Sequence, residues 1–183
     1  MPDYWDVYCE SVCRGENSYC AWGAVIQSPD GRQQIQSGFI GDFGTSETAA
    51  VVAATEALKF VPEYQYANLY SSDHYTVDSI AKSLGGWIQR GWRTKTGPVA
   101  HKKLWIAFND VYKPRNIKLH MVRDIQKSQN SQTAQKAAED KLLEYTEDPV
   151  DSLIALLVKN LKRYESNSVV VNAAELYLQS KKV

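Results

Sequence analysis

The sequence predicts an α/β domain, a five-stranded mixed sheet flanked by helices, followed by a C-terminal helical extension. Three strand-like segments come first, and a hairpin turn separates the second from the third. Helical segments then alternate with two further strand-like segments, which is typical of a sheet covered by helices. The chain has 183 residues, enough for one domain and an appended segment, and we place these at residues 1–145 and 146–183.

The first three segments are predicted to be antiparallel strands. Residues 6–12 alternate between two kinds of side chain, as a half-buried strand does. Residues 19–27 form a second, apolar strand, and residues 33–40 a third. The sequence Ser28-Pro29-Asp30-Gly31 joins the last two, with proline and glycine at positions that favour a tight turn.

The remaining elements follow from capping residues and breakers. Thr45 is a good N-cap for an alanine-rich helix that runs to Leu58, and Pro62 prevents its continuation. Residues 67–72 form a fourth strand that ends at Asp73. The later elements are a helical stretch to about residue 90 with an interruption at Gly85-Gly86, a helix over 99–112, a strand over 116–122 and a helix over 128–145.

Composition narrows the class of protein. With 44% hydrophobic residues the chain can bury a core, and no apolar run is long enough to span a membrane. The N-terminal sequence shows no secretory signal, so we expect an intracellular protein in cytoplasm or nucleus. Cys9, Cys13 and Cys20 are therefore expected to be reduced thiols. Zinc binding is the weaker alternative, because their spacing fits no usual set of zinc ligands. With 21 basic and 21 acidic residues, any nucleic-acid surface must be a local patch.

Three acidic residues fall at predicted strand and helix ends. Glu10 lies on the first strand, Glu47 in the first turn of the first helix, and Asp73 at the end of the fourth strand. In a sheet that places the first strand beside the fourth, these carboxylates can converge, and clustered carboxylates hold Mg²⁺ or Mn²⁺. The alternatives are structural: an acid in a first turn stabilises its helix, and an aspartate after a strand caps the next one.

The chain resembles the type 1 ribonuclease H family over about residues 3–143. The resemblance rests on Glu10-Ser-Val-Cys-Arg-Gly15 with Trp22-Gly-Ala-Val-Ile26, on the helix that begins Thr45-Ser-Glu47, and on Tyr70-Ser-Ser-Asp73. It implies a ribonuclease H-like fold and catalytic, metal-binding roles for Glu10, Glu47 and Asp73. Residues 87–105, with Trp87 and Trp92, resemble the basic protrusion of that family.

The catalytic set that the resemblance implies is incomplete. Glu10 stands where the family has aspartate, and the extra methylene displaces the carboxylate by roughly an ångström. The last aspartate corresponds to Gln135, and an amide is a poor ligand for Mg²⁺. The histidine corresponds to Ile125, which cannot carry a proton. Possible substitute ligands are Asp124, Glu139 and Asp140.

The segment from residue 87 to residue 103 is a candidate nucleic-acid interface. It contains five basic residues and no acidic one, which suits a phosphate backbone, and its tryptophans suit sugars or bases. The alternative is a solvated positive face. The candidate binding residues are Trp87, Arg90, Trp92, Arg93 and Lys95.

Three functional hypotheses follow. The first is a ribonuclease H-like domain whose cleavage is impaired or lost and which binds nucleic acid or protein in a larger assembly. The second is an active metal-dependent ribonuclease that cleaves the RNA strand of RNA–DNA hybrids, with Glu10, Glu47 and Asp73 holding Mg²⁺ or Mn²⁺. The third is a structural interaction domain. Its protein partner would dock on the C-terminal extension, where Leu153, Ile154, Leu157, Val158 and Leu161 form an apolar stripe. The alternative is that this stripe covers the sheet or the helices of the domain itself.

Overall fold

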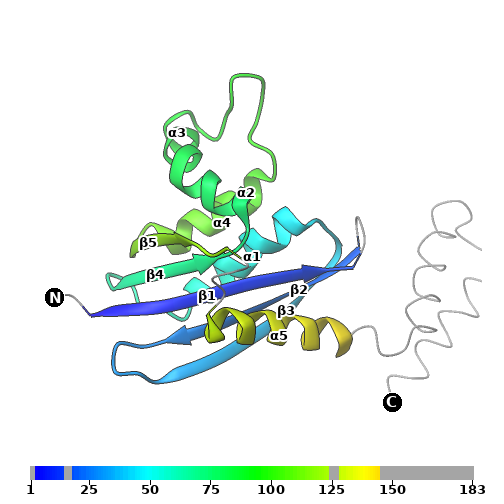
Figure 1. The fold of residues 1–183 in the computed structure, drawn as a ribbon. Coiled ribbons are helices and arrows are strands. Elements are labelled where there is room, and N and C mark those ends of the chain that lie inside the picture. The colour runs from blue at the N-terminus through cyan, green and yellow to red at the C-terminus, as the bar shows by residue number, and fades with distance from the viewer. Residues whose placement is uncertain (1–2, 15–17, 124–127, 145–183) are drawn as a thin grey trace, which may run out of the picture. The chain divides into compact units, whose positions relative to one another are not determined.

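A computed structural model describes residues 3–14, 18–123 and 128–144. They form five strands and the helices that flank them (Figure 1). The strands are β1 (Tyr4–Cys13), β2 (Ser18–Gln27), β3 (Gln33–Gly44), β4 (Tyr66–Ser71) and β5 (Asn116–Met121). The helices are α1 (Ser46–Leu58), α2 (His74–Asp78), the π-helical turn η1 (Ser79–Ser83), α3 (Leu84–Gln89), α4 (Lys102–Tyr112) and α5 (Gln129–Glu144). The predicted mixed sheet with flanking helices is confirmed.

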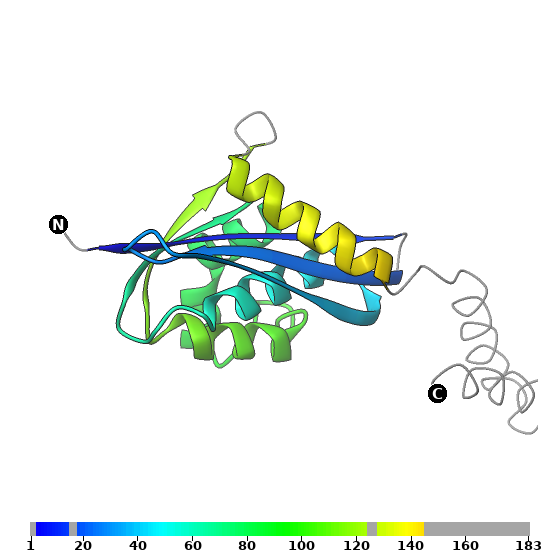
Figure 2. The same cartoon turned by 90° about the horizontal axis from the view of Figure 1, so that it is seen from below.

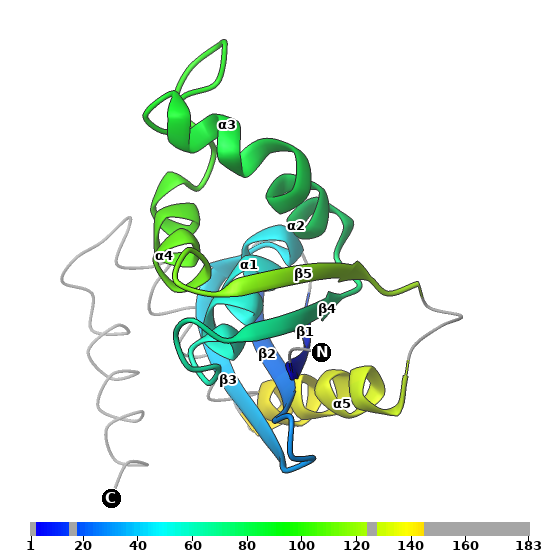
Figure 3. The ribbon, with the colours of Figure 1, turned by 90° about the vertical axis from the view of Figure 1, so that its left-hand side faces the viewer.

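The strands lie in the order β3-β2-β1-β4-β5, which Figure 3 shows from the side. β1 is therefore central, antiparallel to β2 and parallel to β4. β5 continues the sheet parallel to β4 and forms one edge. Because β1 and β4 run in the same direction, the residues that follow β4 lie beside the second half of β1.

Helices cover both faces of the sheet, with α5 on the face opposite α1 and α4 (Figure 2). Thr45 caps α1 as predicted, because its hydroxyl accepts from the Thr48 backbone N–H and the Thr48 hydroxyl accepts in return from the Thr45 N–H. Small alanine side chains line the buried side of α1, so the helix approaches the sheet closely. The largest fully buried side chains are those of Trp105 and Phe108 of α4.

Two predicted helix boundaries are wrong. The helical segment after β4 is not interrupted at Gly85-Gly86, because both glycines lie inside α3 and the irregularity falls earlier, at η1. The helix expected from residue 99 begins at Lys102, because His101 has the left-handed φ of 53° and cannot belong to it.

The chain divides into two units, residues 1–142 and residues 143–183. The predicted C-terminal helical extension, including the apolar stripe from Leu153 to Leu161, lies outside the described residues. Within the part that the structure describes, no helix has the length and apolar character needed to cross a bilayer.

Candidate functional site

A small open cavity lies where β1 and β4 approach the start of α1. Its volume is about 150 Å³. Glu10 and Asp73 both line it, so the structure brings two of the three predicted acidic residues to one place. The other lining residues are small, and most are hydroxylic: Cys9, Ser11, Ser46, Ala50, Ser71 and Ser72. Such a cavity offers carboxylate and hydroxyl oxygens to a ligand.

Glu10 is buried, with 6% of its surface exposed, although it carries a carboxylate. The Ser72 hydroxyl donates a hydrogen bond of 2.5 Å to Glu10 Oε2. This contact crosses from β1 to the residue that follows β4, and it meets part of the cost of burying a charged group. Ser72 was not among the predicted site residues; the one sequence signal for it is its place directly before Asp73.

Asp73 has the structural role that was the alternative to catalysis. Its side chain accepts a 2.6 Å hydrogen bond from the Thr76 backbone N–H and caps α2. The Asp73 backbone N–H donates in turn to the Ser71 hydroxyl at 3.2 Å. The capping geometry holds this carboxylate at the junction of β4 and α2, where it lines the cavity.

Glu47 is exposed in the first turn of α1 and does not line the cavity, although its neighbour Ser46 does. Within residues 3–14, 18–123 and 128–144, no group of three or more His, Cys, Asp or Glu side chains is close enough to hold a metal ion. Carboxylate and hydroxyl oxygens suit Mg²⁺ chemically. As placed, however, the described residues do not form a preassembled metal centre.

The position expected to complete the acidic set lies on α5. Gln135 donates to Glu139 Oε1 at 2.9 Å, and Asp140 forms an ion pair of 2.6 Å with Lys136. The two described substitutes, Glu139 and Asp140, therefore have partners on their own helix. Asp124 and Ile125 lie outside the described residues.

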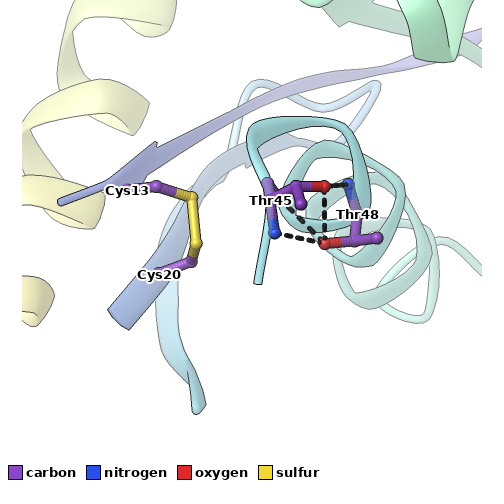
Figure 4. Close-up of a disulfide and its surroundings, with 4 residues drawn as sticks. All are labelled: Cys13, Cys20, Thr45 and Thr48. Atoms are coloured by element: carbon purple, nitrogen blue, oxygen red, sulfur yellow. Dashed lines mark hydrogen bonds between the residues drawn. A yellow bond between two sulfur atoms is a disulfide. The ribbon is translucent and has the colours of Figure 1, made fainter. Parts of the chain in front are cut away.

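The expectation of three reduced cysteines is wrong. Cys13 and Cys20 form a disulfide, shown in Figure 4 beside the cap that begins α1. The two residues are direct partners in the β1–β2 ladder, with Cα atoms 4.2 Å apart. Spacing alone could not reveal the pairing because it depends on this register. Cys9 is a free, buried thiol, and burial raises its pKa.

The basic segment projects from the sheet with α3 and the turn that follows it (Figures 1 and 3). Arg90, Arg93 and Lys95 are exposed, as are Lys102 and Lys103 at the start of α4. The tryptophans instead face inward: Trp87 packs edge-on against buried Trp105 with ring centroids 5.3 Å apart, and Trp92 packs against the same core. The cations are therefore available to a ligand, while the tryptophans support the segment that carries them.

Residues 3–142 match the family model described as RNase H. A protein of Cupriavidus metallidurans named Ribonuclease H is 29% identical over 119 residues, covering 64% of this chain and 80% of that protein. One of Clostridium botulinum with the same name is 26% identical over 144 residues, covering 76% of this chain and 95% of that protein.

Solved structures show the same fold at lower identity. The crystal structure of LC9-RNase H1, described as a type 1 RNase H with the type 2 active-site motif, has a TM-score of 0.65 at 18% identity, covering 77% of this chain and 74% of that chain. The crystal structure of LC11-RNase H1 in complex with an RNA/DNA hybrid has a TM-score of 0.52 at 17% identity. The match covers 75% of this chain and 99% of that chain.

Proposed function

This chain belongs to the RNase H family, and from that premise we propose that it binds RNA–DNA hybrids while its cleavage activity is impaired. The observation that carries this proposal is the composition of the cavity. Glu10 and Asp73 line it, each already engaged by a hydrogen-bond donor of the protein, whereas Glu47 does not. Gln135 supplies an amide where the family resemblance implies a carboxylate.

The basic segment supports the binding half of the proposal. Five cations lie within residues 90–103, all exposed, and the same stretch contains no acidic side chain. Phosphate contacts of this kind supply most of the affinity in sequence-independent binding. The similar structure of LC11-RNase H1 was solved with a hybrid bound, which makes a hybrid the first ligand to test.

Cleavage of a labelled RNA–DNA hybrid in Mg²⁺ and in Mn²⁺ tests the catalytic half. The related C. metallidurans protein is the positive control, and a Glu47→Gln, Asp73→Asn double variant reports on contaminating nuclease. We expect a rate at least about a thousandfold below that of the control protein, because the absence of metal ligands costs several kcal/mol of transition-state stabilisation. Cleavage within tenfold of the control protein that the double variant abolishes would contradict impairment.

The second candidate function is an active ribonuclease, and the names of the curated relatives favour it. In this proposal Glu10, Glu47 and Asp73 would hold Mg²⁺ or Mn²⁺, and a bound metal would supply the activation of water that cleavage of the RNA strand needs. The side chain of Glu47 would have to turn toward the cavity from the first turn of α1. The cleavage assay decides between the two functions.

A gel shift with the same samples tests binding separately from cleavage. We expect hybrid to be retained both in Mg²⁺ and in a chelator. If no nucleic acid is bound in either condition, the binding half fails, and the structural interaction domain becomes the favoured hypothesis.

A further inference from the structure

The Cys13–Cys20 disulfide lies at the turn end of the β1–β2 hairpin, whose first strand carries Glu10. Cys13 is the last residue of β1, and Cys20 opposes it on β2, so the bond joins two paired strands at the end of the sheet. Cys13 is half-buried, whereas Cys20 is fully buried. A reductant therefore meets the Cys13 side of the disulfide first.

The same end of the sheet is irregular on its other side. The β2–β3 ladder shifts register on both sides of Cys20, which pairs with Gly41. Hydrogen bonding there is weaker than in a regular ladder, because a bulge leaves a residue unpaired. The covalent bond thus joins β2 to β1 at the point where the pairing of β2 with β3 is irregular.

This irregular end leads directly into α1. Ser18 pairs with Gly44, and the residue after Gly44 is Thr45, which caps the helix whose first turn carries Glu47. Figure 4 shows the disulfide beside the Thr45–Thr48 cap. The disulfide therefore joins the strand that holds Glu10 to β2, and the other neighbour of β2 is β3, which leads into the cap that positions Glu47.

We propose that Cys13 and Cys20 form a reversible thiol–disulfide site that controls the order of this end of the domain. The co-reactant is a dithiol reductant. One of its thiolates attacks the Cys13 sulfur, the disulfide breaks, and Cys20 leaves as a thiolate that takes up a proton. The second thiol of the reductant then displaces Cys13 as a thiol, leaving the reductant as a disulfide. Reduction frees the ends of β1 and β2, loosens the start of α1 and weakens hybrid binding, and this last effect rests on the proposed function.

The third cysteine does not take part. Cys9 is 1% exposed, packs in the core between the sheet and α1, and directs its thiol to the Tyr70 carbonyl oxygen at 3.5 Å. Burial raises the pKa of the Cys9 thiol, and thiol–disulfide exchange needs the thiolate. Exchange is therefore confined to the Cys13–Cys20 pair.

Alkylation of the folded full chain before and after treatment with dithiothreitol tests the site directly. We expect no alkyl group on the untreated protein and two after reduction, at Cys13 and Cys20, with Cys9 reacting only in denaturant. Trypsin cleavage after exposed Arg14, which follows Cys13, should be about tenfold faster in the reduced form because the strand ends open. Hybrid affinity should fall about fivefold, since the start of α1, which lines the cavity beside Glu10, is less well ordered in the reduced form.

A Cys13→Ser, Cys20→Ser variant is the control and should match the reduced protein, with no response to dithiothreitol. If that variant does not fold, reduced wild-type protein and Cys13→Ala alone give the same comparison. Cysteines that alkylate without reduction, or equal trypsin rates in the two forms, would overturn the proposal. Absence of hybrid binding in every form would count against the proposed function alone, because alkylation and proteolysis still measure the state of the pair.

Discussion

At the scale of single residues, the hydrogen bond from Ser72 to Glu10 is expected to contribute to the stability of the folded domain. Ser72→Ala removes a donor from a carboxylate that is 6% exposed. We expect the free energy of unfolding to fall by about 1–3 kcal/mol, the usual effect of leaving a buried charged acceptor one donor short. Urea unfolding measures it.

Ser46→Ala is the matched control for Ser72→Ala. Ser46 lines the same cavity but is exposed at the start of α1, so its substitution should change stability by less than about 0.5 kcal/mol. Equal decreases in the two variants would show that the cavity wall, and not the Glu10 contact, determines stability here.

Single residues also show what the sequence can and cannot predict. The capping roles of Thr45 and Asp73 follow from local chemistry, because a short oxygen-bearing side chain before a helix bonds its first free N–H groups. The Ser72–Glu10 bond and the Cys13–Cys20 disulfide do not follow. Each joins two segments through a strand register that only the folded sheet fixes.

At the scale of secondary-structure elements, the backbone of α5 lies in close contact with β2 at Gly23. A Cβ at Gly23 would lie 2.1 Å from the Ala134 carbonyl oxygen and 2.6 Å from the Ala138 backbone nitrogen. Gly23→Ala should therefore displace α5 and lower the free energy of unfolding by about 3 kcal/mol or more.

Gly85→Ala is the control, since Gly85 lies in α3 with open space around it. This substitution should raise the free energy of unfolding by up to about 1 kcal/mol, because alanine favours a helix more than glycine does. Thermal unfolding followed by circular dichroism distinguishes them.

A row of stacked rings crosses three strands on the same face as Glu10. Tyr8 of β1 stacks on Tyr70 of β4, and Tyr70 on His120 of β5, with centroids 4.4 and 4.6 Å apart. His120 Nε2 lies 3.0 Å from Asn68 Oδ1, while the Asn68 amide donates to Asp6. The side-chain oxygen of Asn68 can only accept a hydrogen bond, so His120 Nε2 carries the hydrogen and donates it to Asn68 Oδ1.

This row predicts a pH dependence of stability. Burial, followed by the charge of Lys118, lowers the pKa of His120 below its usual 6.5, although Asp6 opposes the shift. A lowered pKa favours the neutral ring in the folded state, so stability is complete above about pH 6.5 and falls as the pH drops through the folded value. Urea unfolding between pH 8 and pH 5 should show the decrease, and His120→Gln should reduce it. His74→Gln controls for removing a histidine; an equal reduction there would contradict the assignment.

Elements were predicted best where a local signal marks both ends. The strands and α1 have turns, caps or breakers at their boundaries. The helical run after β4 was misjudged because paired glycines favour interruption locally, whereas packing of Leu84 and Trp87 on the core keeps α3 helical through them. Tertiary contacts outweighed propensity at that point.

At the scale of the whole molecule, the formal charges cancel, so binding to nucleic acid must come from one surface. Arg93→Gln together with Lys95→Gln removes two exposed cations of the projecting segment. Arg90 is kept because its Nε bonds the Arg93 carbonyl oxygen. The slope of log affinity for a hybrid against log salt should become shallower by about 2, one unit for each phosphate that the variant no longer neutralises.

A Lys59→Gln, Lys136→Gln double variant removes the same charge outside that segment, at the C-cap of α1 and on α5. It should leave the salt slope unchanged in fluorescence anisotropy titrations. Equal changes in both double variants would mean that net charge, and not this surface, governs binding.

The position of β1 in the sheet has a consequence for the order in which the domain folds. β1, β2 and β3 are neighbours in sequence and pair as a meander, so their contacts close short loops. The β1–β4 pair joins residues such as Val7 and Leu69, far apart along the chain, and closing that loop costs more entropy. We expect the meander to form first and the cavity beside Glu10 to be completed last, when β4 docks. Ser72→Ala would then speed unfolding in stopped-flow experiments while leaving the folding rate nearly unchanged.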